Sequence, residues 1–171
     1  MAQLPEWFSR LDFSAMEDAP NKLAECEFFF SLASQETDRA KFRWLVSAFF
    51  NAAYSYFEMS ALRAHFAFTT ETGDPLEDRV ALNVLKEYVG VERSSKKSGY
   101  VKTLGRHPIT KKLYDLRRRN THHFPLSIMV TGTDLPEDFH FGHMQGEGAS
   151  GLSFCRDVLS LIHQVQSKIS L

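Results

Sequence analysis

The sequence predicts an all-α protein, an up-down helical bundle of about five helices with a short β-hairpin before the last helix. Three observations support this fold class. Apolar residues recur at helical spacing in several long segments, and capping residues, prolines and glycines separate those segments. The alternation of apolar and polar residues that is typical of strands is confined to one stretch late in the chain.

The length and composition are those of one globular domain. A chain of 171 residues can bury a core without disulfide or metal staples, so we expect a single domain over 1–171, irregular at 1–19. Hydrophobic residues make up 43% and charged residues 24%, which argues against disorder over most of the length. Cys26 and Cys155 lie in apolar helical patterns and in no metal-binding spacing, so we expect buried, reduced thiols.

Two helices are predicted in the first part of the chain. The segment 21–33 has apolar residues at helical spacing and follows Pro20, a residue suited to the first turn of a helix. A longer helix begins after an N-cap at Thr37 or Asp38 and runs to Phe66. Its apolar residues cover so wide an arc that we expect this helix at the centre of the bundle, packed on several neighbours.

A short helix and a basic loop are predicted in the middle of the chain. A turn cluster over 69–75 leads into a third helix, which begins at Asp74-Pro75 and ends near Tyr88. Glycine, serine and basic residues then replace the helical pattern over 90–107, where we expect a mobile basic loop.

The last part of the chain predicts a hairpin and a closing helix. Apolar and polar residues alternate over 126–130 and 139–144, as in two short paired strands. The glycine-rich stretch 146–151 is expected to be a flexible connector, and 152–169 has the pattern of an amphipathic helix.

Several other classes of protein are disfavoured. Residues 1–7 lack the basic start and apolar stretch of a secretory signal, which favours the cytoplasm. Polar residues interrupt the apolar run 44–62, so we expect a core helix and no membrane contact. No metal or cofactor is expected, because His140 and His143 make only half of a metal site, and the glycines of 146–151 lack the strand-helix context of a dinucleotide fingerprint.

Basic residues are concentrated in one segment. The formal net charge is only −1, yet residues 92–123 carry 10 basic and 2 acidic side chains. Such a segment is typical of a contact with a polyanion, although a solvated loop and helix face has the same composition. The candidate RNA-binding residues are Lys96, Lys97, Lys102, Arg106, Lys111 and Arg119.

The fourth predicted helix begins at Pro108, ends before Pro125 and carries the run 117–123, Arg-Arg-Arg-Asn-Thr-His-His. At 100° per residue, one face carries Arg117, Asn120 and His123, and Arg118 and His122 point nearly opposite. Imidazole exchanges protons near neutral pH and guanidinium binds phosphate, so either set suits phosphodiester cleavage, with Asn120 orienting substrate or catalyst. Without a carboxylate and histidine set at ligand spacing, we expect metal-free attack by a ribose 2′-hydroxyl, hence RNA as substrate. A structural explanation also exists, because cations in a last turn complement the helix dipole.

The segment LYDLRRRNTHHF, which follows the aromatic-rich helix FRWLVSAFFNAAYSYFEMSAL, resembles the HEPN superfamily, whose signature is Arg, four to six residues, then His. The resemblance implies a helical bundle, commonly a homodimer in which two motifs meet, and metal-independent endoribonuclease activity in toxin–antitoxin or other defence systems. It assigns the motif arginine to Arg117, or second to Arg118, and the motif histidine to His123, or second to His122. The polar residue that usually follows the motif arginine is missing. A non-catalytic helical module that binds RNA, a nucleotide or a partner protein, such as an antitoxin, is therefore the alternative.

Overall fold

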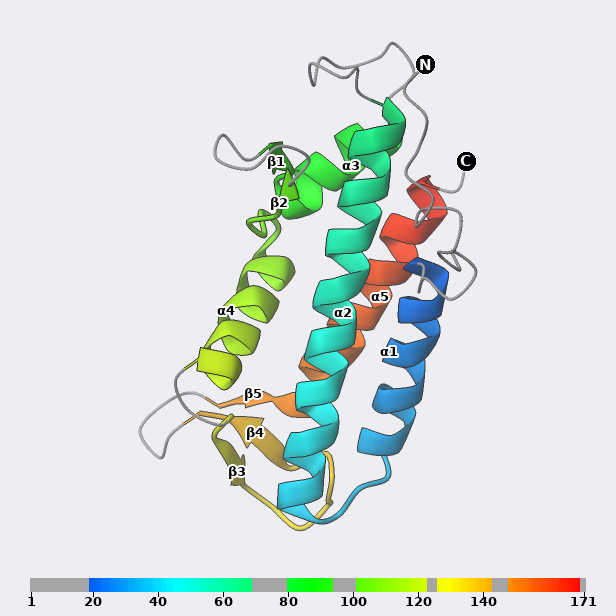
Figure 1. Ribbon diagram of the computed structural model, residues 1–171. Coiled ribbons are helices and arrows are strands. Elements are labelled where there is room, and N and C mark those ends of the chain that lie inside the picture. Colours follow the sequence, from blue (N-terminus) through cyan, green and yellow to red (C-terminus); the bar gives the residue numbers. More distant parts are fainter. Residues whose placement is uncertain (1–18, 69–79, 94–100, 123–125, 143–147, 170–171) are drawn as a thin grey trace, which may run out of the picture.

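The computed structural model describes residues 19–68, 80–93, 101–122, 126–142 and 148–169 (Figure 1). The predicted irregular start and the predicted start of the third helix lie outside them. The described helices are α1 (Ala19–Ala33), α2 (Arg39–Phe68), α3 (Val80–Val89), α4 (Pro108–His122) and α5 (Gly151–Ile169). The described strands are β1 (Glu92–Arg93), β2 (Val101–Lys102), β3 (Ile128–Val130), β4 (Phe139–Phe141) and β5 (Ala149–Ser150). The predicted all-α class, with a hairpin before the last helix, is confirmed.

Helix α2 is the central element, as its wide apolar arc predicted. The Asp38 carboxylate caps it by accepting a 2.9 Å hydrogen bond from the backbone N–H of Lys41. The helix contacts all the other described helices. In Figure 1, α1 and α5 lie along one side of α2, α4 lies along the other, and α3 lies near its C-terminal end. Among the described helices, none is both long and apolar enough to cross a membrane.

Aromatic side chains join the helices to the small sheet. Phe42 and Phe50 of α2 are buried, and their ring centroids lie 4.6 Å from that of Phe139 and 5.7 Å from that of Phe141. Ring pairs at such separations add about 0.5–1.5 kcal/mol each to the gain from burial. The sheet is thereby held against the N-terminal half of α2.

The described ends of the predicted basic loop are more ordered than the sequence indicated. Strands β1 and β2 pair antiparallel, with Glu92 opposite Lys102. Beyond β2, the N–H groups of Leu104 and Arg106 donate to the carbonyls of Val89 and Tyr88, over 2.8 and 2.9 Å. The last carbonyls of a helix have no partner within it, and this segment supplies the missing donors for α3.

The predicted hairpin forms the first two strands of a three-stranded antiparallel sheet. Ile128 pairs with Phe141 in β3 and β4. The third strand, β5, comes from the stretch that was expected to be a flexible connector, so that prediction is wrong for Ala149 and Ser150. The glycine that follows explains the composition, because a Cβ on Gly151 would lie 3.1 Å from the Phe42 ring. Close packing, as well as turning, requires a glycine at this position.

Candidate nucleic-acid site on helices α4 and α2

Helix α4 presents its candidate residues to different surroundings. Leu113 is fully buried, Arg117 and Asn120 are half-buried, and Arg118 and Arg119 are exposed. Arg117 and Asn120 therefore lie on the side of the helix that meets the rest of the protein. Arg118 and Arg119 extend into solvent.

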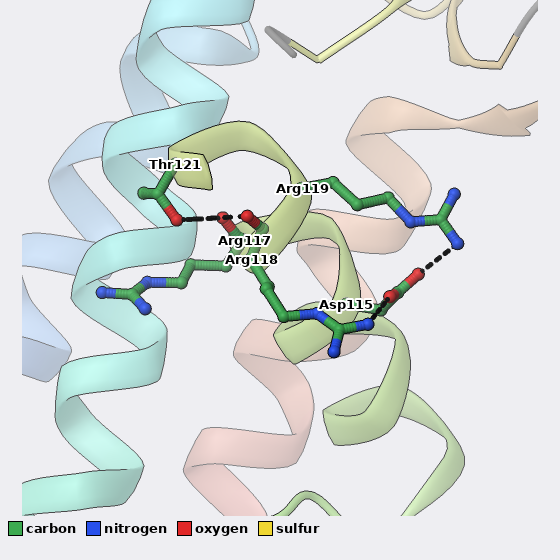
Figure 2. Close-up of polar contacts among 5 residues, drawn as sticks. All are labelled: Asp115, Arg117, Arg118, Arg119 and Thr121. Atoms are coloured by element: carbon green, nitrogen blue, oxygen red, sulfur yellow. Dashed lines mark hydrogen bonds and ion pairs between the residues drawn. The ribbon is translucent and has the colours of Figure 1, made fainter. Parts of the chain in front are cut away.

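Arg117 reaches across to α2. Its guanidinium carbon lies 4.3 Å from the centroid of the Tyr54 ring, and its Nε donates a 3.4 Å hydrogen bond to Oδ1 of Asn51. Figure 2 shows this side chain extending away from Arg118 and Arg119. Both contacts on α2 are made by neutral groups, and no carboxylate of the described residues pairs with Arg117. The guanidinium is therefore oriented while its charge stays available to an anion.

Arg118 and Arg119 share one carboxylate. The oxygens of Asp115 lie 3.0 Å from Nη2 of Arg118 and 2.8 Å from Nη2 of Arg119, one and the next position along the helix (Figure 2). About two thirds of each arginine side chain is exposed, so water weakens both ion pairs. Two positive charges against one negative leave this part of the surface with a net positive charge.

Asn120 has a structural contact. Its Oδ1 accepts a 3.2 Å hydrogen bond from the backbone N–H of Leu126, six residues along the chain. The Thr121 hydroxyl bonds back to the Arg117 carbonyl over 2.9 Å, as is common in a last helical turn (Figure 2). His122 is the last residue of α4, but its side chain, like all of His123, lies outside the described residues.

A pocket of about 450 Å³ opens between α2, α4 and the segment after β2. Its charged lining residues are Lys111, Arg117 and Arg118, with Asp115 as the one acidic residue that lines it. The rest of its lining is Tyr54, Thr103, Leu104 and Tyr114. Three cations against one anion favour a negatively charged ligand, and aromatic side chains beside them suit a nucleotide.

The two tyrosines at this pocket are held in place by polar contacts. Their rings meet edge to face at a centroid distance of 4.7 Å. The Tyr114 hydroxyl donates to Oγ1 of Thr103 over 3.0 Å, and the Tyr54 hydroxyl donates to the Glu58 carboxylate. Burial raises the pKa of Tyr114 above its ordinary value, so this hydroxyl stays protonated and acts as a donor. Tyr54 is thereby fixed as the surface against which Arg117 lies.

The candidate RNA-binding residues do not all converge. Lys111 is exposed and lines the pocket with Arg117, whereas Arg106 is exposed but does not line it. Arg119 is turned to Asp115 on the outer side. The side chains of Lys96, Lys97 and Lys102 lie outside the described residues.

Sequence reasoning missed the contribution of α2 to this site. Asn51 and Tyr54 are polar interruptions in an otherwise apolar helix, and they are the two residues that contact Arg117. This interruption was the available signal. Helical periodicity alone could not show that their side of α2 faces α4.

The remaining candidates have structural roles. Cys26 and Cys155 are buried free thiols, as predicted. Nδ1 of His140 lies 2.9 Å from the Asp138 carbonyl oxygen, and His143 lies outside the described residues. Within the described ranges, no group of three or more His, Cys, Asp or Glu residues is placed to hold a metal ion.

Comparisons with known proteins add no further assignment. No protein-family model, curated protein or solved structure matches this chain. The interpretation of the site therefore depends on its own geometry and on the sequence motif.

Proposed function

We propose that this protein is a metal-independent endoribonuclease, in which Arg117 binds the scissile phosphate and His123, or as second choice His122, transfers protons. The observation that carries the proposal is the state of Arg117. It lies at the edge of a cationic pocket, supported by Tyr54 and Asn51, with no carboxylate of the described residues to neutralise it. A guanidinium in this state is prepared to bind a phosphodiester.

The proposed reaction needs no atom from outside the RNA and the protein. The ribose 2′-oxygen attacks the neighbouring phosphorus and gives its proton to a general base. The bond from phosphorus to the 5′-oxygen breaks, and that oxygen receives a proton from a general acid. The products are a 2′,3′-cyclic phosphate and a 5′-hydroxyl end. Arg117 stabilises the charge that builds up on the non-bridging phosphate oxygens.

The proposal includes a homodimer in the cytoplasm, as the resemblance to HEPN proteins implies, with an antitoxin or other partner protein restraining it. An exposed apolar surface beside Arg117 supports the dimer. Trp44 and Leu62 are 60% and 37% exposed, and 18 residues of α-helix place them on the same side of α2 as Asn51. Sedimentation should show a dimer that Trp44→Asp dissociates, and a parent protein that is monomeric at assay concentrations would rule it out.

The test of the activity is cleavage of single-stranded RNA by the purified protein in EDTA. Arg117→Ala and one of the two variants His123→Ala and His122→Ala should each lower the rate by about a hundredfold or more. Arg63→Ala, which removes an exposed arginine elsewhere on α2, is the matched control and should cleave like the parent. The proposal fails if the parent leaves RNA intact, or if Arg117→Ala cuts it as fast as the control does.

A second function, RNA binding without cleavage, is favoured by one observation. The Asn120 side chain is committed to the Leu126 amide, so it is not available to orient a substrate as it stands. This alternative predicts an RNA affinity that falls steeply with added salt, and no products. Cleavage that depends on Arg117 would remove it.

A further inference from the structure

A second arginine-lined pocket lies where α2 begins. It has a volume of about 320 Å³ and is lined by Arg39, Ala40 and Arg43 on α2 and by 126–128 on the other wall. Arg39 is exposed and Arg43 is half-buried. Neither guanidinium pairs with a carboxylate anywhere in the part of the chain that the structure describes.

The nearest acidic residues along the chain already have other contacts. The Glu36 carboxylate accepts a 2.8 Å hydrogen bond from the Asp38 N–H, and the Asp38 carboxylate accepts one from the Lys41 N–H. They lower the local positive potential but do not bridge the arginines. Other described arginines are engaged differently, since Arg118 and Arg119 share Asp115. The pocket therefore holds two guanidinium groups with unused donors.

The two arginine pockets lie along one side of α2. Eleven residues of α-helix separate Arg43 from Tyr54, which places their side chains about 20° apart around the axis and about 16 Å apart along it. Tyr54 supports Arg117 at the first pocket. The end of α4 joins the two, because Asn120 bonds to Leu126, and Leu126 lines the pocket of Arg39 and Arg43.

We infer that Arg39 and Arg43 bind a second phosphate of the RNA strand, a few nucleotides from the phosphate at Arg117. The inference rests on the proposed function and specifies how its substrate is held. Two guanidinium groups four residues apart on a helix can both donate to one phosphate, and arginine makes such bonds in pairs. The subsite would set the register of the strand and would leave the chemical step to α4.

The test compares RNA binding and cleavage by the parent, Arg39→Ala/Arg43→Ala and the control Arg63→Ala. The double variant should bind a single-stranded RNA of about twelve nucleotides roughly tenfold more weakly than the parent, and the slope of log affinity against log salt should fall by about two. Arg39→Lys/Arg43→Lys should retain most of the salt slope, because the charge remains. A dinucleotide substrate, which reaches only Arg117, should be cleaved by the double variant at the parental rate.

The outcomes separate this inference from the proposed function. If the parent binds and cleaves RNA and the double variant does so equally well with the same salt slope, the second subsite is overturned and the ribonuclease stands. If the parent neither binds nor cleaves RNA, both fall. Titration with inorganic phosphate, followed by the NMR signals of the arginine Nε–H groups, identifies the source of the anion. Signals of Arg39 and Arg43 that respond to phosphate, in a protein whose RNA affinity ignores both residues, would overturn the assignment to RNA.

Discussion

The neighbours of Arg117 determine what its charge can do. A carboxylate partner would satisfy the guanidinium, whereas Tyr54 and Asn51 orient it and leave it cationic. A cation over an aromatic face gains about 0.5–1 kcal/mol at an exposed site, which is enough to favour one rotamer and too little to outcompete a phosphate. The contrast with Arg118, which is paired to Asp115, distinguishes the two candidate motif arginines.

Asn120 is predicted to contribute to stability and not to the reaction itself. Asn120→Ala leaves the Leu126 N–H without its acceptor and should lower the free energy of unfolding by about 1–2 kcal/mol, measured by urea denaturation. Asn120→Asp keeps an oxygen at the same position and should retain most of that stability. Folded Asn120→Ala should cleave RNA at close to the parental rate, and a loss of cleavage without a loss of stability would restore Asn120 to the catalytic set.

At the residue scale, the sequence predicted side chain placement better than side chain contact. Helical phasing placed Arg117 and Asn120 on one side of their helix, and both are half-buried. It could not show that Asn120 bonds to the amide of Leu126, because that contact depends on the return of the chain after the helix. Nor could it find Asn51 and Tyr54, which are 66 and 63 residues away from Arg117 in the sequence.

At the scale of elements, helix boundaries followed from capping residues and prolines, and the short strands did not. The Asp38 cap and Pro108 were readable as starts of α2 and α4. Strand β5 was missed because Ala149 and Ser150 have little strand preference of their own. Its pairing with β4 comes from the tertiary contact that Gly151 allows.

Gly151→Ala tests this explanation of the connector. The added Cβ would lie 3.1 Å from the Phe42 ring and 3.2 Å from the Phe139 carbonyl oxygen, in a fully buried site. We expect a loss of about 1–3 kcal/mol in the free energy of unfolding. Ser160→Ala, on the exposed side of the same helix, is the control and should change it little. A Gly151→Ala protein as stable as the parent would show that the connector is flexible after all.

At the scale of the whole molecule, the core controls the reactivity of the two thiols. Cys26 and Cys155 are buried on α1 and α5, and burial raises the pKa of Cys26 from 9.0 to about 12 and raises that of Cys155 as well. Only the thiolate reacts with alkylating reagents. The folded protein should therefore resist alkylation at pH 8, and both thiols should react when it is denatured.

The same pKa shifts make stability depend on alkaline pH. In the unfolded chain a thiol ionises near pH 9, whereas the folded thiols remain protonated, so their contribution is complete below pH 9 and declines above it. At pH 10 the loss should be about 1.4 kcal/mol for each thiol. The decline between pH 8 and 10, measured by urea denaturation, should be shallower in Cys26→Ala/Cys155→Ala than in the parent. Equal slopes would show that the thiols are accessible in the fold.

The central claim, that Arg117 serves a reaction in which the ribose 2′-hydroxyl attacks, has one direct measurement. Two oligonucleotides of the same sequence, one all-RNA and one with every 2′-hydroxyl methylated, are incubated with the parent and with Arg117→Ala in EDTA, and the products are resolved on a denaturing gel. The account predicts that the parent cuts the RNA into fragments with 2′,3′-cyclic phosphate ends, leaves the methylated strand whole, and that Arg117→Ala cuts neither. Intact RNA in the parent reaction, or equal cleavage of both strands, would contradict it.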